Sequence, residues 1–119
     1  MNTAHKTQPD PSNVLAKASL EAGRKLGLTQ ADVSAVIGRD RSGIRRDGID
    51  PGTKAGELAL MLIRAYRSVY VLVGGDESAM KHWFGTRNRH FDAVPKELVR
   101  TAEGLVRVVH YLDAMRGRI

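Results

Sequence analysis

The apolar positions of this chain follow a helical repeat almost throughout. They recur at intervals of three and four residues, and no segment alternates apolar and polar positions as a half-buried strand does. In the first segment, over 13–26, the apolar stripe comprises Val14, Leu15, Ala18, Ala22 and Leu26. In the longest segment, over 53–73, it comprises Leu58, Ala59, Leu62, Tyr66, Val69 and Val73. The pattern therefore predicts an all-α protein.

Capping residues and glycines indicate where these helices begin and end. An oxygen before a helix can accept hydrogen bonds from the free amides of the first turn. Residues of this kind precede five apolar segments: Thr29, Asp40, Thr53, Asp76 and Thr101. For the first helix the candidate caps are Ser12 and Asn13. Glycines follow four of the helices and can end them: Gly27, Gly38, Gly48 and the pair Gly74–Gly75.

The chain divides into three parts on this pattern. Residues 1–12 are polar, include two prolines and are predicted to form a disordered N-terminal arm. Residues 13–50 hold three short helices joined by tight turns. Residues 51–119 begin with a Pro-Gly turn, continue with the long helix and end with a helix over about 101–115.

Composition limits the compartment and the chemistry. The N-terminus has no apolar core, and the longest apolar run, Leu58 to Ile63, is too short to span a membrane. The chain contains no cysteine, which excludes disulfides and thiolate metal sites. We therefore expect a cytoplasmic protein that does not associate with membranes.

Positive charge is concentrated in one short stretch. The net charge is +6, which favours an anionic partner. Residues 13–50 hold seven Lys and Arg against five Asp and Glu, and residues 51–119 hold eleven against seven. The larger excess thus lies in the second part, but the densest cluster is Arg39 to Asp47, where four arginines and two aspartates occupy nine positions.

This cluster falls in a segment with the spacing of a helix-turn-helix, whose second helix enters the major groove of DNA. Arginine can donate two hydrogen bonds to guanine there, and serine can contact several base edges. The candidate DNA-binding residues are Gln30, Arg39, Arg41, Ser42, Arg45 and Arg46. The alternative is a solvated arginine face on a helical hairpin that serves only for packing.

Three positions depart from the usual form of this motif. Ser34 stands near a position that is usually alanine, and Arg39 occupies a position that is usually apolar, so that its side chain should reach outward from the turn. Gly43 lies inside the recognition helix, where it costs roughly 1 kcal/mol relative to Ala. We therefore expect a short or pliable recognition helix.

Residues suited to catalysis are present but not in productive spacing. His5, His82, His90 and His110 lack the spacing of metal ligands, and His82 and His90 are interpreted as surface residues. The Gly74–Gly75 pair is not followed by the Lys-Ser/Thr of a phosphate-binding loop. We expect no catalytic site, no metal and no cofactor, although a small enzyme of unknown chemistry is a third class to weigh.

The second part of the chain carries a more specific pattern. It consists of Gly75–Asp76 before a helix, then Trp83, Thr86, Asn88, Arg89, Phe91, Pro95, Leu98, the sequence TAEG at 101–104, Val108 and Leu112. This pattern resembles the antitoxins of the Xre/MbcA/ParS type, which pair with RES-domain toxins. With the helix-turn-helix, the resemblance covers residues 13–119. Two features depart from it: Phe84 replaces a common leucine, and the loop over 86–95 lacks a common Gly-Gly.

The resemblance implies a function that composition does not. Such an antitoxin is not an enzyme; it binds a toxin that degrades NAD or transfers ADP-ribose from it, and it blocks the active site. Its helix-turn-helix commonly binds operator DNA and represses its own operon, and family members form homodimers. The candidate toxin-binding residues are Trp83, Arg87, Asn88, Arg89, Arg116, Gly117, Arg118 and Ile119.

Simpler interpretations of these residues stay open. Trp83 can be a core residue, Arg87 and Arg89 can be solvated loop residues, and the tail after 115 can lie free in solvent. The main alternative function is a free-standing helix-turn-helix transcriptional regulator without a toxin partner.

Overall fold

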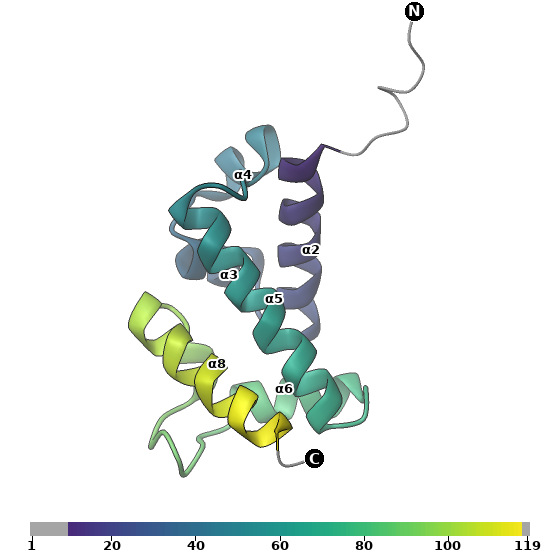
Figure 1. Ribbon diagram of the computed structural model, residues 1–119, viewed down its shortest axis with the longest axis vertical. Coiled ribbons are helices and arrows are strands. Elements are labelled where there is room, and N and C mark those ends of the chain that lie inside the picture. Colours follow the sequence, from purple (N-terminus) through teal and green to yellow (C-terminus); the bar gives the residue numbers. More distant parts are fainter. Residues whose placement is uncertain (1–9, 118–119) are drawn as a thin grey trace, which may run out of the picture.

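The computed structural model describes residues 10–117, and these residues form seven helices and no strand (Figure 1). In chain order the helices are α2 (Pro11–Lys25), α3 (Gln30–Ile37), α4 (Arg41–Asp47), α5 (Lys54–Leu72), α6 (Glu77–Gly85), α7 (Pro95–Leu98) and α8 (Ala102–Arg116). The prediction of an all-α protein is confirmed for this part of the chain. Residues 1–9, most of the predicted arm, lie outside the described residues.

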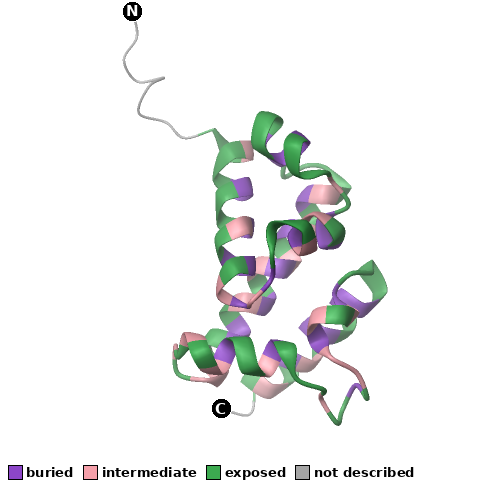
Figure 2. Ribbon diagram, turned by 180° about the vertical axis from the view of Figure 1, so that it is seen from behind, coloured by how far each residue is buried: buried purple, intermediate pink, exposed green. Residues whose placement is uncertain are grey.

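The longest helix, α5, is the element on which both parts of the chain pack. It runs diagonally through the molecule, with α2 and α8 along it and with α3 and α6 in contact with it (Figure 1). Buried positions lie on the inward faces of these helices (Figure 2). Four core residues of α5 have no exposed surface: Ala59, Leu62, Ala65 and Val69. The predicted boundary at residue 50 therefore separates two stretches of sequence that share one core.

Five of the predicted helix caps are confirmed. Thr29 Oγ1 accepts a hydrogen bond from the Asp32 amide at 3.0 Å, and the Asp32 carboxylate accepts one from the Thr29 amide at 2.9 Å. This reciprocal arrangement is a capping box, which satisfies two amides that the helix cannot pair itself. The other four caps each accept from a first-turn amide: Asp40, Thr53, Asp76 and Thr101.

The first helix begins earlier than predicted. Its cap is Asp10, which accepts from the Ser12 amide at 3.0 Å, rather than Ser12 or Asn13. Pro11 then occupies the first helical position, where the missing N–H costs nothing because that donor would have no partner in the helix. The predicted arm over 1–12 is thus too long at its C-terminal end, since residues 10–12 belong to the start of α2.

The buried face of α2 also differs from the predicted stripe. Val14 is 47% exposed and Ala18 is exposed, although both were predicted to face the core. Ser19 is completely buried in their place, and its hydroxyl donates to the Leu15 carbonyl at 2.7 Å. A serine that satisfies its hydroxyl within its own helix can be buried at little cost. Ser68 of α5, a polar residue outside the predicted apolar stripe, is buried as well.

Two glycines allow the turn before a helix to fold back against that helix. A β-carbon on Gly104, in the first turn of α8, would overlap the carbonyl oxygen of Leu98. A β-carbon on Gly56, in the first turn of α5, would overlap the carbonyl oxygen of Asp50. Backbone atoms cannot move aside as a flexible side chain can, so these positions demand glycine for space.

Asp32 links the helix-turn-helix to the C-terminal part. In addition to its capping role, its carboxylate lies 3.3 Å from Arg100 Nη1 and 3.9 Å from Lys96 Nζ. The hydrogen bond from the Thr29 amide, helped by these two cations, holds the pKa of Asp32 below its ordinary value. The two parts of the chain are therefore joined by an ion cluster as well as by the core.

Within the described residues, no single helix is long and apolar enough to cross a membrane. The helices α5 and α6 are long and apolar enough only when taken together, and the chain bends by 117° between them.

Candidate functional site

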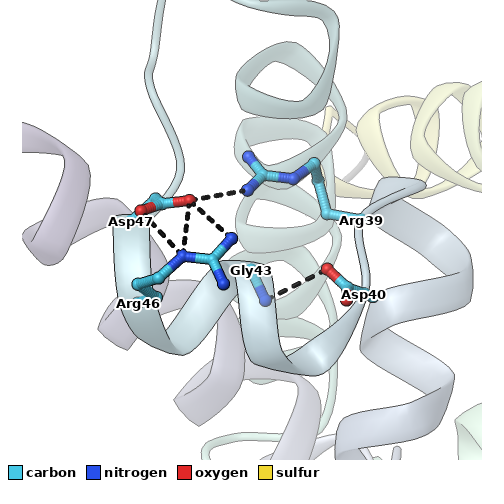
Figure 3. Close-up of polar contacts among 5 residues, drawn as sticks. All are labelled: Arg39, Asp40, Gly43, Arg46 and Asp47. Carbon is cyan, nitrogen blue, oxygen red and sulfur yellow. Dashed lines mark hydrogen bonds and ion pairs between the residues drawn. The ribbon is translucent and has the colours of Figure 1, made fainter.

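The two aspartates of the arginine cluster around α4 have different partners (Figure 3). Asp40 does not pair with an arginine; its Oδ1 accepts from the Gly43 amide at 3.0 Å and caps the helix. Asp47 accepts from Arg46 Nε at 3.2 Å and lies 3.8 Å from Arg39 Nη2. The hydrogen bond to Asp47 raises the pKa of Arg46 further. These exposed ion pairs contribute little to stability.

Gly43 has a specific role in this arrangement. A β-carbon there would lie 2.5 Å from Asp40 Oδ1 and 2.9 Å from Arg39 Nη2. Glycine thus gives room for the capping carboxylate and for the Arg39 guanidinium, which lies against α4 (Figure 3). Arg39, expected to reach outward from the turn, is folded back, with its side chain 34% exposed. The recognition helix is short as expected, and its glycine is explained by this contact.

The other predicted DNA-binding residues have exposed side chains. They are Gln30 at the start of α3, and Arg41, Ser42 and Arg45 on α4. Gln30, Arg41 and Arg45 line one cavity, and Lys17 of α2 lines it with them. The structure therefore brings three of the six predicted residues to one place. It adds Lys17, which the helix-turn-helix pattern could not indicate because it lies on the preceding helix.

A second candidate surface, the aromatic surface, is built from α6, the loop after it and α8. Trp83 stacks on Tyr111 with ring centroids 6.4 Å apart, and His90 stacks on Tyr111 at 4.4 Å. Phe91 meets Tyr111 edge-on at 5.0 Å, and the Arg107 guanidinium lies 5.7 Å from the centre of the Phe91 ring. Aromatic stacking and cation–π contacts of this kind fix side chains that are only partly buried.

Three residues of the aromatic surface were not found from the sequence. The sequence pattern did not indicate Tyr111 or Arg107, and it led to the interpretation of His90 as a plain surface residue. His90 is exposed, but with Phe91, Arg107 and Tyr111 it lines a cavity of about 450 Å³. These contacts join residues that are far apart in the chain, so no local spacing could have revealed them. Trp83 is half-buried against the core, which agrees with the simpler interpretation of a packing residue.

The loop after α6 is shaped by Asn88. Its side-chain oxygen accepts from the His90 amide at 2.8 Å, and its backbone amide donates to the Ala93 carbonyl at 2.9 Å. Arg87 forms an exposed ion pair with Asp92, whose backbone has a positive φ of 55°. Arg89 is exposed and forms no ion pair within residues 10–117. Asn88 thus organises the loop, whereas Arg87 and Arg89 present charge at its surface.

Arg116, at the C-terminal end of α8, faces α5, away from the aromatic surface. Arg116 Nη1 donates to the buried Ser68 hydroxyl of α5 at 3.3 Å. Gly117 is the C-cap, and its amide donates to the Asp113 carbonyl at 3.1 Å. Arg118 and Ile119, the last two predicted toxin-binding residues, lie outside the described residues. Arg116 borders cavities on the α5 face, not the cavity of the aromatic surface, so the predicted set is split between two faces.

Metal chemistry has no evident site in this part of the chain. Over residues 10–117, no three His, Asp or Glu side chains are grouped so that they could hold a metal ion.

Comparison with known families places part of the chain beside a described domain. Residues 68–118 match a family described as the antitoxin Xre/MbcA/ParS C-terminal toxin-binding domain. The matched residues include the end of α5, all of α6, the aromatic surface and α8. Comparison with curated proteins gave no match. The family match supports the resemblance found in the sequence: residues 68–118 are similar to the toxin-binding domain of antitoxins.

Proposed function

We propose that this chain is the antitoxin of a RES-domain toxin that consumes NAD, and that it neutralises the toxin by blocking the toxin's active site. The observation that carries the proposal is the match of residues 68–118 to an antitoxin toxin-binding domain. The RES identity of the toxin is supported by the sequence resemblance over residues 13–119. Both partners would act in the cytoplasm.

The proposed toxin contacts lie on two faces, which suggests two ways to block a cleft. In the first, the loop with Arg87 and Arg89 and the aromatic surface beneath it cover the cleft. In the second, the tail after α8 enters the cleft. In that case Arg118 would meet acidic groups at the rim of the cleft.

Truncation separates these two mechanisms. Deleting residues 117–119 removes the tail but leaves the contact between Arg116 and Ser68. If the tail fills the active site, the truncated chain should still bind the toxin while NAD consumption returns. If the loop covers the cleft, the truncated chain should inhibit fully.

We also propose that α4 and the start of α3 bind the operator upstream of the chain's own gene and repress it. The support is the set of exposed side chains that can reach DNA together: Gln30, Arg41, Ser42, Arg45 and Arg46. Arg46 would exchange its exposed ion pair with Asp47 for a phosphate or base contact. A free-standing regulator would use the same surface, so this feature does not decide between the two functions.

Self-association through α5 is the third part of the proposal. The exposed large apolar side chains lie along α5 and the adjoining face of α2: Val14, Leu60, Tyr70 and Val71. They border two cavities of about 510 and 390 Å³ that share Arg67 and Arg116. Met61, which also lies on α5, is partly buried and packs against the core. A dimer would present two α4 helices to successive turns of the major groove.

Sedimentation tests self-association through α5. At micromolar concentration the chain should sediment as a dimer, and a Leu60→Glu variant should sediment as a monomer.

Growth rescue tests the proposed function as a whole. The reading frame next to this gene should encode a RES-domain protein that arrests growth when expressed alone, and co-expression of this chain should restore growth. Rescue should persist when Arg41 and Arg45 are replaced by alanine, because DNA binding is not needed for neutralisation. Failure of the intact chain to rescue, or absence of a toxic neighbour, would favour the free-standing regulator.

A further inference from the structure

A cavity of about 360 Å³ lies between α2, α3 and α4, within the size range of small-molecule sites. It is lined by apolar side chains that include Leu20 and Ile44 and by polar ones that include Ser34, Lys17, Arg41 and Arg45. Each of the three helices contributes at least one of these residues. The cavity is far from the aromatic surface, since α4 and α8 lie toward opposite ends of the molecule (Figure 1).

Ser34 is the unusual residue of this cavity. Its hydroxyl oxygen is buried and has no hydrogen-bond partner, and it is the one side-chain oxygen or nitrogen in this state among residues 10–117. Ser19, also in a helix interior, donates to the carbonyl four residues before it. Ser68 accepts from Arg116. A buried hydroxyl without a partner is costly, and this one borders a cavity that could supply a partner.

The charge of the cavity is uncompensated. Lys17, Arg41 and Arg45 all line it, and none of them forms an ion pair within the described residues. No carboxylate of the described residues lines it either. The two aspartates of the recognition segment are engaged elsewhere, Asp40 as the cap of α4 and Asp47 with Arg39 and Arg46.

We propose that this cavity binds a small organic anion, a carboxylate attached to an apolar body. The three cations attract the carboxylate, the Ser34 hydroxyl donates a hydrogen bond to it, and the apolar lining covers the body. A DNA phosphate could contact the three cations, but the polar sugar-phosphate backbone of the DNA would then lie against the apolar lining. A free anion with an apolar body fits that lining better.

Binding of such an anion would regulate DNA binding, a consequence that rests on the proposed function of α4. Arg41 and Arg45 belong to both surfaces. An anion that holds these guanidinium groups and adds negative charge beside α4 would weaken operator binding, so the anion would act as an inducer. Anion binding itself does not depend on the DNA-binding proposal.

Titration of the intact chain with 1-naphthoate, followed by amide shifts in NMR and by calorimetry, tests the site. The neutral isostere 1-naphthamide should bind at least about tenfold more weakly, because it lacks the charge. Ser34→Ala should weaken naphthoate binding several-fold while leaving the unfolding midpoint unchanged or raised, because the hydroxyl has no partner to lose. Ser78→Ala, an exposed serine on α6, should change neither.

Three outcomes would overturn the proposal: no naphthoate binding at millimolar concentration, equal binding of the amide, or unchanged affinity in Ser34→Ala. A competition arm with DNA from upstream of the gene keeps the two proposals distinct. If the free chain does not bind that DNA, the DNA-binding proposal fails while the NMR titration still decides the anion site.

Discussion

The two ends of this molecule hold their functional side chains by different means. Around α4 the contacts are local in sequence: Asp40 caps Gly43 three residues on, and Asp47 pairs with its neighbour Arg46. In the C-terminal part the aromatic surface and the end of α8 rest on contacts between distant residues, as when Trp83 meets Tyr111 or Arg116 meets Ser68. A surface built from local contacts can be deduced from spacing, whereas one built from distant contacts requires the fold.

This difference has consequences for mutation. The α4 surface depends on single caps and turns, each of which contributes about 1 kcal/mol. In the C-terminal part, the turn before α8 packs its backbone against the first turn of that helix, where a methyl group on Gly104 cannot be accommodated. We therefore expect larger losses of stability from small changes in the C-terminal part.

The largest effect is expected at Gly104. Gly104→Ala places a β-carbon against the Leu98 carbonyl, and the turn before α8 must shift. We expect the free energy of unfolding to fall by about 3 kcal/mol, the upper range for overpacking. The control is Gly85→Ala at the end of α6, where a β-carbon meets nothing within 4 Å and stability should change by less than about 1 kcal/mol. Equal urea midpoints for the two variants would refute the packing argument.

The next effect concerns DNA affinity within the arginine cluster. Arg45→Ala should weaken binding to the operator by about 1–3 kcal/mol if the side chain contacts a base. Arg39→Ala should cost less, because that guanidinium is folded over Gly43 and shares Asp47 with Arg46. Mobility shifts at one fixed salt concentration measure both. A greater loss for Arg39 than for Arg45 would show that the turn, not α4, carries the contact.

A smaller effect is expected at the cap of α4. Asp40→Ala removes the acceptor for the Gly43 amide and should lower stability by about 1 kcal/mol. Asp40→Asn keeps an acceptor oxygen and should retain most of that stability. Thermal unfolding of the three proteins compares them, and identical midpoints would mean that solvent replaces the cap.

The smallest effect is a pH dependence at Asp32. Its pKa is lowered in the folded state, so its contribution is complete above the unfolded pKa of about 4 and is lost as the pH falls through the lower folded value. Asp32→Asn should therefore reduce stability by about 0.5–1 kcal/mol at pH 7, and the difference from wild type should close as the pH falls below the lowered folded-state pKa of Asp32. Glu21 and Glu77 also have lowered pKa values, but they are common to both proteins and cancel. If the difference in stability between wild type and Asp32→Asn were independent of pH, the effect would come from packing rather than from the charge of Asp32.

Much of the fold followed from the sequence because its signals are local. Five caps and the glycine stops placed six helices nearly correctly, and the C-terminal pattern pointed to the family later matched over 68–118. The differences from the predicted pattern arose where side-chain contacts override it. Ser19 is buried because its hydroxyl donates to a carbonyl of its own helix, and Ser68 is buried because its hydroxyl accepts from Arg116 of α8. Arg39 folds back because Gly43 leaves room for its guanidinium. The role of Tyr111 in the aromatic surface and the cavity at Ser34 could not be deduced from the sequence. Each depends on residues of several elements that only the fold brings together.

One pair of variants tests directly whether the two ends serve different partners. The chain, Arg45→Ala and Arg89→Glu are each titrated with the toxin encoded next to the gene and with operator DNA. Arg45→Ala should lose DNA affinity and keep its affinity for the toxin, while Arg89→Glu should do the reverse, because each side chain is exposed on a different surface. If one variant lost both affinities while remaining folded, or if the intact chain bound no toxin, the assignment of two separate surfaces would be wrong.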